Sequence, residues 1–214
     1  RWDEETGATR VNADTARDAQ YSVQGNYFPL AGMWRIRVIV RRASVEDVEV
    51  AFPVFVGAGK LSALNDPRAL DRLRASDAAM NLLQSVRVTQ DLNDGANAVV
   101  TTRFEYAAPD RLRYEIAGQG ESIVILATQY YREGGAWTTR FRAEPLKFPD
   151  FSNAAFAAGV KLGRTEKIGG VDAQIVRFAS PTGDTQYAVW LDDARRMRQL
   201  AMVAPAHYMI QAYS

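Results

Sequence analysis

The chain has 214 residues, of which 47% are hydrophobic and 24% are charged, and it contains no cysteine. This composition is typical of a globular protein with one large core or two small ones. The 26 lysines and arginines balance 25 aspartates and glutamates, and the formal net charge of +1 disfavours nucleic acid as a partner. The lack of cysteine excludes disulfides, thiolate metal sites and thiol catalysis.

The chain contains no apolar run close to the roughly 20 residues that a membrane-spanning helix needs. It opens with RWDEETGATR, which is polar and turn-like and does not resemble a charged-then-apolar leader. We therefore interpret the sequence as a piece of a larger protein, whose signal or membrane segment lies outside these residues.

Residues 1–57 contain about four strand-like segments separated by turn residues. In MWRIRVIV, Trp34, Ile36 and Val38 alternate with Arg35 and Arg37, which is the pattern of a strand with one buried face. A complete immunoglobulin-like sandwich takes about seven strands and about 100 residues. This region therefore predicts a partial immunoglobulin-like β-domain in which Trp34, Ile36 and Val38 are buried.

A short, flexible stretch from Gly57 predicts a linker, and a helix follows it. Asp66 stands at the N-cap and Pro67 at the first helical position, and both residue types favour a helix start there. Apolar residues then recur on one helix face, namely Leu70, Leu73, Met80 and Leu83.

From Ser85 onward, short amphipathic segments alternate with turn residues. RLRYEI is the clearest of them, because its apolar and aromatic residues face one way and its charged residues the other. The segments that follow are ESIVILATQYY, AWTTRFR, VDAQIVRF, TQYAVWL and RQLAMV. Together they predict an antiparallel meander, interrupted by one short helix that Ser152 caps and Gly159 ends.

A long antiparallel sheet with only one strong helix must cover its apolar face. We therefore expect residues 58–214 to form a mainly β domain in which a curved sheet surrounds the helix. A curved sheet of this kind can leave a ligand cavity on its concave face. The candidate lining residues are Phe104, Tyr114, Ile116, Ile125, Tyr130, Trp137, Phe141, Val189 and Met202, and the alternative is that most of them are plain core.

The sequence argues against catalysis. The chain has a single histidine, and no serine lies in a G-x-S-x-G motif. The adjacent carboxylates Asp192 and Asp193 are typical of a solvated turn. GAGKLS lacks the Ser or Thr that follows the lysine of a phosphate loop, and DLNDGAN lacks the spacing of a calcium loop and predicts a hairpin turn at Asp94 and Gly95. No enzyme activity and no cofactor are therefore expected.

The single histidine, His207, precedes Met209 by two positions in the segment AHYMI, which predicts a terminal strand with both side chains on one face. Imidazole and thioether ligands suit Cu(I), and Met202 could approach from a neighbouring strand. A copper site needs one more close soft ligand, and the five methionines are scattered along the chain. We therefore expect no metal at His207, with direct copper binding as the alternative.

GNYFPLAGMWRIRVIVRR and the following DVEVAFPVFVG carry one family resemblance. Residues 20–57 resemble the extracytoplasmic β-domain that follows the membrane helices in copper transport proteins of the CopD and YcnJ type. In that family an aromatic-containing turn and a small residue precede a Trp that starts a strand. Histidine ligands like those of the copper-binding domains in that family are absent before His207, so the resemblance implies no copper ligand in this chain.

A second resemblance covers about residues 62–214 and rests on APDRLRYEI, YYREGGAW, FPDF, GRTEKIGGVDAQIVRF and YAVWLDDARRMRQLAM. These segments are similar, in the same order, to the LolA, LolB and RseB-like group of bacterial envelope proteins. The resemblance implies an incomplete β-barrel wrapped around helices, which in several members of the group holds acyl chains.

Together these observations predict two domains, a partial immunoglobulin-like domain over 1–57 and a LolA-like domain over 58–214. We expect a non-catalytic, extracytoplasmic module of a bacterial membrane protein that binds an apolar ligand or a partner protein, in support of copper transport.

Overall fold

The computed structural model describes residues 14–15, 21–22, 32–41, 48–56, 61–93, 98–133, 135–204 and 207–214. The chain divides into two compact units, Arg1–Gly59 and Lys60–Ser214. Each unit is described by itself.

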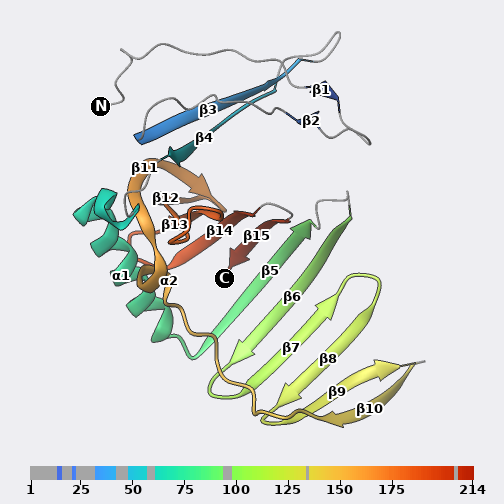
Figure 1. The fold of residues 1–214 in the computed structure, drawn as a ribbon. Helices are drawn as coiled ribbons and strands as arrows, with labels where there is room; N and C mark the ends of the chain where they lie inside the picture. The colour runs from blue at the N-terminus through green and yellow to red at the C-terminus, as the bar shows by residue number, and fades with distance from the viewer. Residues whose placement is uncertain are drawn as a thin grey trace. The chain divides into compact units, whose positions relative to one another are not determined.

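The described part of the first unit consists of two antiparallel strand pairs (Figure 1). A short pair joins β1 (Asp14–Thr15) to β2 (Tyr21–Ser22), and a long pair joins β3 (Gly32–Val40) to β4 (Val48–Val56) in unbroken register.

The alternation within β3 does not produce one fully buried face. Trp34 and Ile36 are half-buried, but 43% of Val38 is exposed, so the prediction that Val38 is buried is wrong. Two paired strands alone leave both of their faces open wherever no second layer covers them. The further strands of an immunoglobulin-like sandwich would fall outside the described residues, and the sandwich stays a prediction.

The second unit is built on one antiparallel sheet of eleven strands in the order β10-β9-β8-β7-β6-β5-β15-β14-β13-β12-β11 (Figure 1). Its strands are β5 (Ser85–Asn93), β6 (Val99–Ala107), β7 (Arg111–Ile116), β8 (Gly120–Ile125), β9 (Thr128–Glu133), β10 (Ala136–Phe141), β11 (Ala158–Ile168), β12 (Val171–Ala179), β13 (Gln186–Leu191), β14 (Met197–Ala204) and β15 (His207–Tyr213).

The sheet consists of two meanders that meet in its middle. Strands β5 to β10 run outward in chain order, strands β11 to β15 return, and β15 pairs with β5. The two outermost strands, β10 and β11, are not paired with each other, so the sheet is open. The prediction of a mainly β domain on a large, unclosed antiparallel sheet is confirmed.

Helix α1 (Pro67–Asn81) lies against one face of this sheet and starts as predicted. The Asp66 side chain accepts hydrogen bonds from the backbone N–H groups of Arg68 (2.9 Å) and Ala69 (3.5 Å), as an N-cap residue should. Leu73 and Met80 are each 1% exposed and pack in one core with Val86 and other apolar residues of the sheet. We call the sheet face that packs against α1 the inner face, and the opposite one the outer face.

Three local predictions differ from the structure. Residues Leu61–Leu64, assigned to a linker, form a 3-10 helix, and Val160 N–H donates to the Asn65 side chain (3.0 Å), so this stretch is fixed to β11. ESIVILATQYY is not one strand but β8 and β9, because Leu126 turns the chain at a φ of 54°. The short helix α2 (Asn153–Phe156) ends before Gly159, which lies inside β11 at a φ of 64°.

Candidate ligand-binding site

The strand register places the nine candidate lining residues on two different faces. Cross-strand partners point the same way, and residues one apart point oppositely. Phe104 lies opposite both Val88 and Tyr114, on the inner face. The candidates on this face are Phe104, Tyr114, Ile116, Val189 and Met202.

The other four candidates point away from α1. Ile125 lies opposite Arg111, and Tyr130 lies between Ile123 and Thr139, all on the outer face. Trp137 and Phe141 continue this face on β10, and 85% of Phe141 is exposed. The assignment of Ile125, Tyr130, Trp137 and Phe141 to the concave face is therefore corrected, because the register across the turns before β8, after β8 and after β9 could not be read from the sequence.

A cavity of about 270 Å³, the inner cavity, lies on the inner face. Its floor includes Val88, Phe104 and Leu200 from three strands, and Phe104 is the one predicted candidate in its lining. Val189 is fully buried in the core, while Ile116 and Met202 are half-buried outside this lining. Whether any of these residues binds a ligand stays a prediction.

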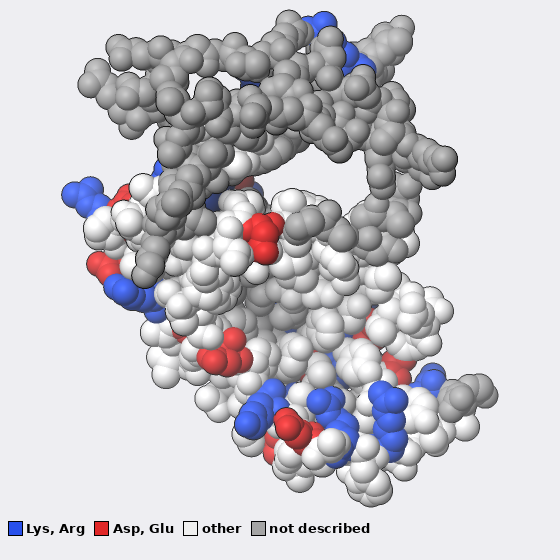
Figure 2. Space-filling model, viewed as in Figure 1, with Lys and Arg blue, Asp and Glu red and all other residues white. Residues whose placement is uncertain are grey.

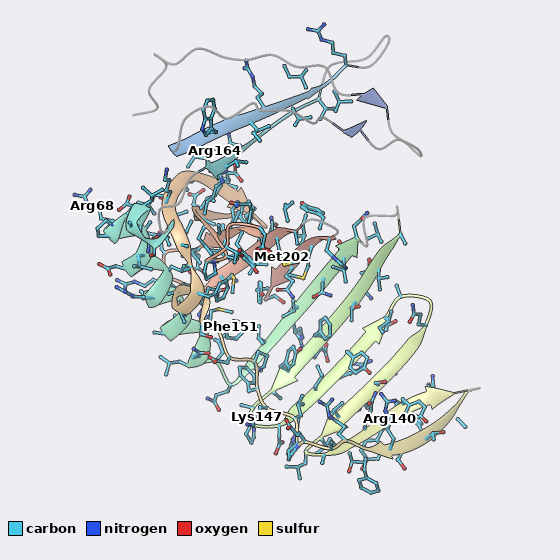
Figure 3. All side chains as sticks on the ribbon, viewed as in Figure 1. Arg68, Arg140, Lys147, Phe151, Arg164 and Met202 are labelled. Carbon is cyan, nitrogen blue, oxygen red and sulfur yellow. The ribbon has the colours of Figure 1, made fainter. Side chains whose placement is uncertain are left out.

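The chain between β10 and β11, residues 142–157, covers this cavity, and we call it the crossing segment. The crossing segment passes beside α1 before it forms α2, and its residue Phe151 contacts α1 through Asn81 (Figures 1 and 3). Pro149, Asp150 and Phe151 line the cavity from this side. The inner cavity is thus bounded by the sheet below and by the crossing segment above.

Two polar side chains of α1 hold the crossing segment in place. The Asn81 amide donates to the Phe151 carbonyl and accepts from the Phe151 N–H, both at 2.8 Å. One turn earlier, Asp77 accepts from the Ala154 N–H (2.7 Å) and the Asn153 amide (3.0 Å). Burial raises the pKa of Asp77, although these hydrogen bonds oppose the rise. Sequence reasoning missed both residues; their four-residue spacing beside the apolar helix face was the available signal.

A second cavity of about 580 Å³, the end cavity, lies where β5, β7 and β14 begin and β6, β8 and β15 end. Met80 and Leu83 line it at the C-terminal end of α1. Leu112 lines it from the inner face of the sheet, and Ile123 and the predicted candidate Ile125 line it from the outer face. A volume of this size lies within the range of small-molecule sites.

Tyr106, Met197 and Tyr213 line both cavities and form the wall between them. Tyr213 stacks edge-on against Phe151, with ring centroids 6.2 Å apart, and its hydroxyl donates to Gln211 at 2.5 Å. Burial raises the pKa of both tyrosines, so their hydroxyls stay neutral at physiological pH. Met197 belongs to the core and is 3% exposed, so the wall consists of packed residues.

The turn before β14 shapes one rim of the end cavity. Asp192 is only 4% exposed, and it accepts hydrogen bonds from the Arg196 N–H and from Arg198 Nε, both at 2.8 Å. The prediction of a turn at Asp192 and Asp193 is correct, but Asp192 is buried rather than solvated. Its carboxylate organises the turn and fixes Arg198.

The far part of the inner face, on β7 to β10, carries a polar cluster. Gln129 is 4% exposed; it donates to the Tyr114 hydroxyl (2.8 Å) and to Ser122 (3.2 Å), and it accepts from Arg140 Nε (2.9 Å). Arg140 lies on this outlying part of the sheet (Figure 3). Tyr114, a candidate for apolar contact, therefore has its hydroxyl engaged in a hydrogen-bond network.

The predicted soft-metal residues lie at the β14–β15 hairpin. Met202 and Met209 are direct cross-strand partners, and His207 lies two residues along the same face of β15. His207 is exposed. Among the residues that the structure describes, no group of three or more His, Cys, Asp or Glu side chains could hold a metal ion.

No helix in the described ranges is both long and apolar enough to cross a membrane. No family model matches the sequence, and no curated protein matches it.

Solved structures share the fold of the second unit. The lipoprotein LppX of Mycobacterium tuberculosis is 12% identical, and the match covers 70% of this chain and 95% of that protein with a TM-score of 0.58. LprF from Mycobacterium bovis is 14% identical over 73% of this chain and 94% of its own, with a TM-score of 0.55. A LolA superfamily protein from Nitrosomonas europaea is also a neighbour, at 10% identity, 68% and 91% coverage and a TM-score of 0.28. The fold assignment rests on the first two.

Proposed function

We propose that this chain is a non-catalytic module that binds an apolar ligand, a lipid or acyl chain, on the inner face of its sheet. The observation that carries the proposal is the pair of cavities, of about 270 and 580 Å³, whose linings share Tyr106, Met197 and Tyr213. Rotation of such side chains would join the two spaces into one elongated site, the shape that an alkyl chain requires.

The crossing segment fits this role because it can retain a ligand without being part of the sheet. It is fixed to α1 through Asn81 and Asp77, at the side of the inner cavity. The fold shared with two mycobacterial proteins, one of them described as a lipoprotein, supports an extracytoplasmic location. A protein partner in place of a lipid is the alternative occupant of the inner face.

The resemblance of residues 20–57 to the β-domain of CopD- and YcnJ-type proteins extends the proposal. In this reading the first unit is a partial immunoglobulin-like domain, and the whole chain belongs to a membrane-anchored protein that supports copper transport. Direct copper binding is the second candidate function, favoured by the opposed Met202 and Met209 beside His207.

The test of apolar binding is a fluorescence titration of the delipidated protein with the neutral dye 1-N-phenylnaphthylamine. Gln90 lines the inner cavity, whereas its neighbour Thr89 points to the outer face. We expect Gln90→Trp to weaken dye binding about tenfold by filling the cavity, and Thr89→Trp to leave it unchanged. Equal binding by both variants, or no binding by the parent protein, would contradict the proposal.

A further inference from the structure

The end cavity is surrounded by cations. Five arginines line it, Arg87, Arg111, Arg113, Arg196 and Arg198, and the first three of them lie on the outer face of the sheet. Glu105 is the one acidic side chain in the lining. Elsewhere on the viewed face of the second unit, charges of both signs are interspersed (Figure 2). The rim of the end cavity therefore departs from the nearly neutral balance of the whole chain.

Three of these arginines already have carboxylate partners. Arg113 pairs with Glu121 (2.6 Å) and with Glu105 (3.7 Å), and Arg87 pairs with Glu105 (3.4 Å). Arg198 pairs with Asp192 at 2.8 Å.

The other two arginines, Arg111 and Arg196, have no ion pair with any residue in the described part of the chain. Both side chains are exposed, so each keeps its hydration and its five donors while the cavity is empty. Arg111 and Arg196 are therefore the two lining arginines without a carboxylate partner in the described ranges, whereas Glu105, Glu121 and Asp192 pair with the other three.

An apolar interior beside two arginines without carboxylate partners is complementary to one class of ligand. Met80, Leu83 and Leu112 offer contacts to an alkyl chain. Tyr106, Met197 and Tyr213 line both this cavity and the inner cavity. Guanidinium groups bind carboxylate and phosphate oxygens through paired, charge-assisted hydrogen bonds.

We infer that the end cavity receives the head of an anionic amphiphile, an alkyl chain ending in a carboxylate or a phosphate, with Arg111 and Arg196 as its counter-ions. The inference rests on the proposed function, because it assigns the polar end of the same ligand. The alkyl chain then runs from the end cavity toward the inner cavity, beneath the crossing segment.

The experiment measures displacement of 1-N-phenylnaphthylamine by matched anionic and neutral competitors. Hexadecanoate is compared with methyl hexadecanoate, and phosphatidylglycerol with diacylglycerol. We expect each anionic competitor to bind about tenfold more tightly than its neutral match, since exposed ion pairs each contribute severalfold. The advantage should shrink in high salt. Preference for hexadecanoate identifies a fatty acid, and preference for phosphatidylglycerol identifies a phospholipid head; either result supports the inference.

The double variant Arg111→Gln with Arg196→Gln should lose about tenfold in affinity for the anions and bind the neutral competitors as before. The control double variant, Arg68→Gln with Arg103→Gln, removes the same charge from two exposed positions outside the cavity lining and should bind like the parent protein. Equal binding of acid and ester, or an unaffected rim variant, would overturn the headgroup assignment while leaving apolar binding intact. Failure of the dye and of every competitor to bind would overturn the proposed function and this inference together.

Discussion

The inner face of the sheet has two halves, one under α1 and one on β7 to β10. Inward and outward residues alternate along the strands of both halves, but the buried inward residues differ in polarity. Under α1, the inward residues are apolar and closely packed: Val86, Val88 and Val189 are at most 6% exposed. On β7 to β10, the inward positions bury Ser122 and Gln129 as well as the apolar Leu112 and Val124. Period-two alternation therefore identifies which residues share a face, but it does not indicate whether the buried residues on that face are apolar or hydrogen-bonded.

The largest expected effect is on the half beneath α1. Leu73→Ala removes a fully buried side chain from the shared core and should lower the free energy of unfolding by about 2–5 kcal/mol. Phe141→Ala, which truncates a larger but 85% exposed side chain on the outer face of β10, should change it by less than about 0.5 kcal/mol. Urea titration, monitored by tryptophan fluorescence, measures the free energy of unfolding of both variants. Similar losses for the two variants would contradict the burial of Leu73 or the exposure of Phe141.

A smaller effect is expected in the polar half. Gln129→Leu keeps the volume but leaves Tyr114, Ser122 and Arg140 without their shared partner. The expected loss is about 1–3 kcal/mol, since unsatisfied buried polar groups are costly. Replacing all the polar partners together by apolar residues should restore part of the loss. A single variant as stable as the parent protein would show that the network is not a source of stability.

A pH-dependent effect is expected where the crossing segment meets α1. Because burial raises the pKa of Asp77 above its ordinary value of 3.8, the folded state holds this proton more tightly than the unfolded state. The contribution of Asp77 to stability is therefore greatest below 3.8 and falls as the pH rises through the folded pKa. Asp77→Asn should lack this decline. The stability of the parent protein relative to the variant should therefore decrease as the pH rises through this window. Parallel pH profiles would contradict the assignment.

The smallest expected effect concerns copper. The apolar half ends at the hairpin that carries Met202, Met209 and the exposed His207. Our expectation is that titration with Cu(I) under reducing conditions gives no stoichiometric binding, and that Met209→Leu titrates like the parent protein. Sub-micromolar uptake that Met209→Leu abolishes would establish the alternative function.

Much of the fold could be predicted from local patterns, and much of the site could not. The Asp66 cap, Pro67 and the apolar positions of α1 are encoded within one segment, and the structure contains that helix. The face of Tyr130 depends on where β8 turns into β9, and a one-residue shift of that turn inverts every later side chain of the strand.

The site itself depends on contacts between distant parts of the chain. Asn81 and Phe151 lie 70 residues apart, and their paired hydrogen bonds have no signature in either segment alone. The arginine rim likewise combines β5, β7 and the turn before β14. Such features follow from the pairing of β5 with β15, which no local pattern announces.

The pairing of β5 with β15 also sets the order in which this unit can mature during synthesis. Each meander consists of neighbouring hairpins, whose strands can pair locally during synthesis. The pairing of β5 with β15 joins the two meanders and can form only after β15 has been synthesised. Tyr106 belongs to the first meander, whereas Met197 and Tyr213 belong to the second. The wall between the cavities is consequently assembled last. A nascent chain halted before β15 would expose the apolar face of the first meander, and chaperones bind exposed apolar surface of this kind.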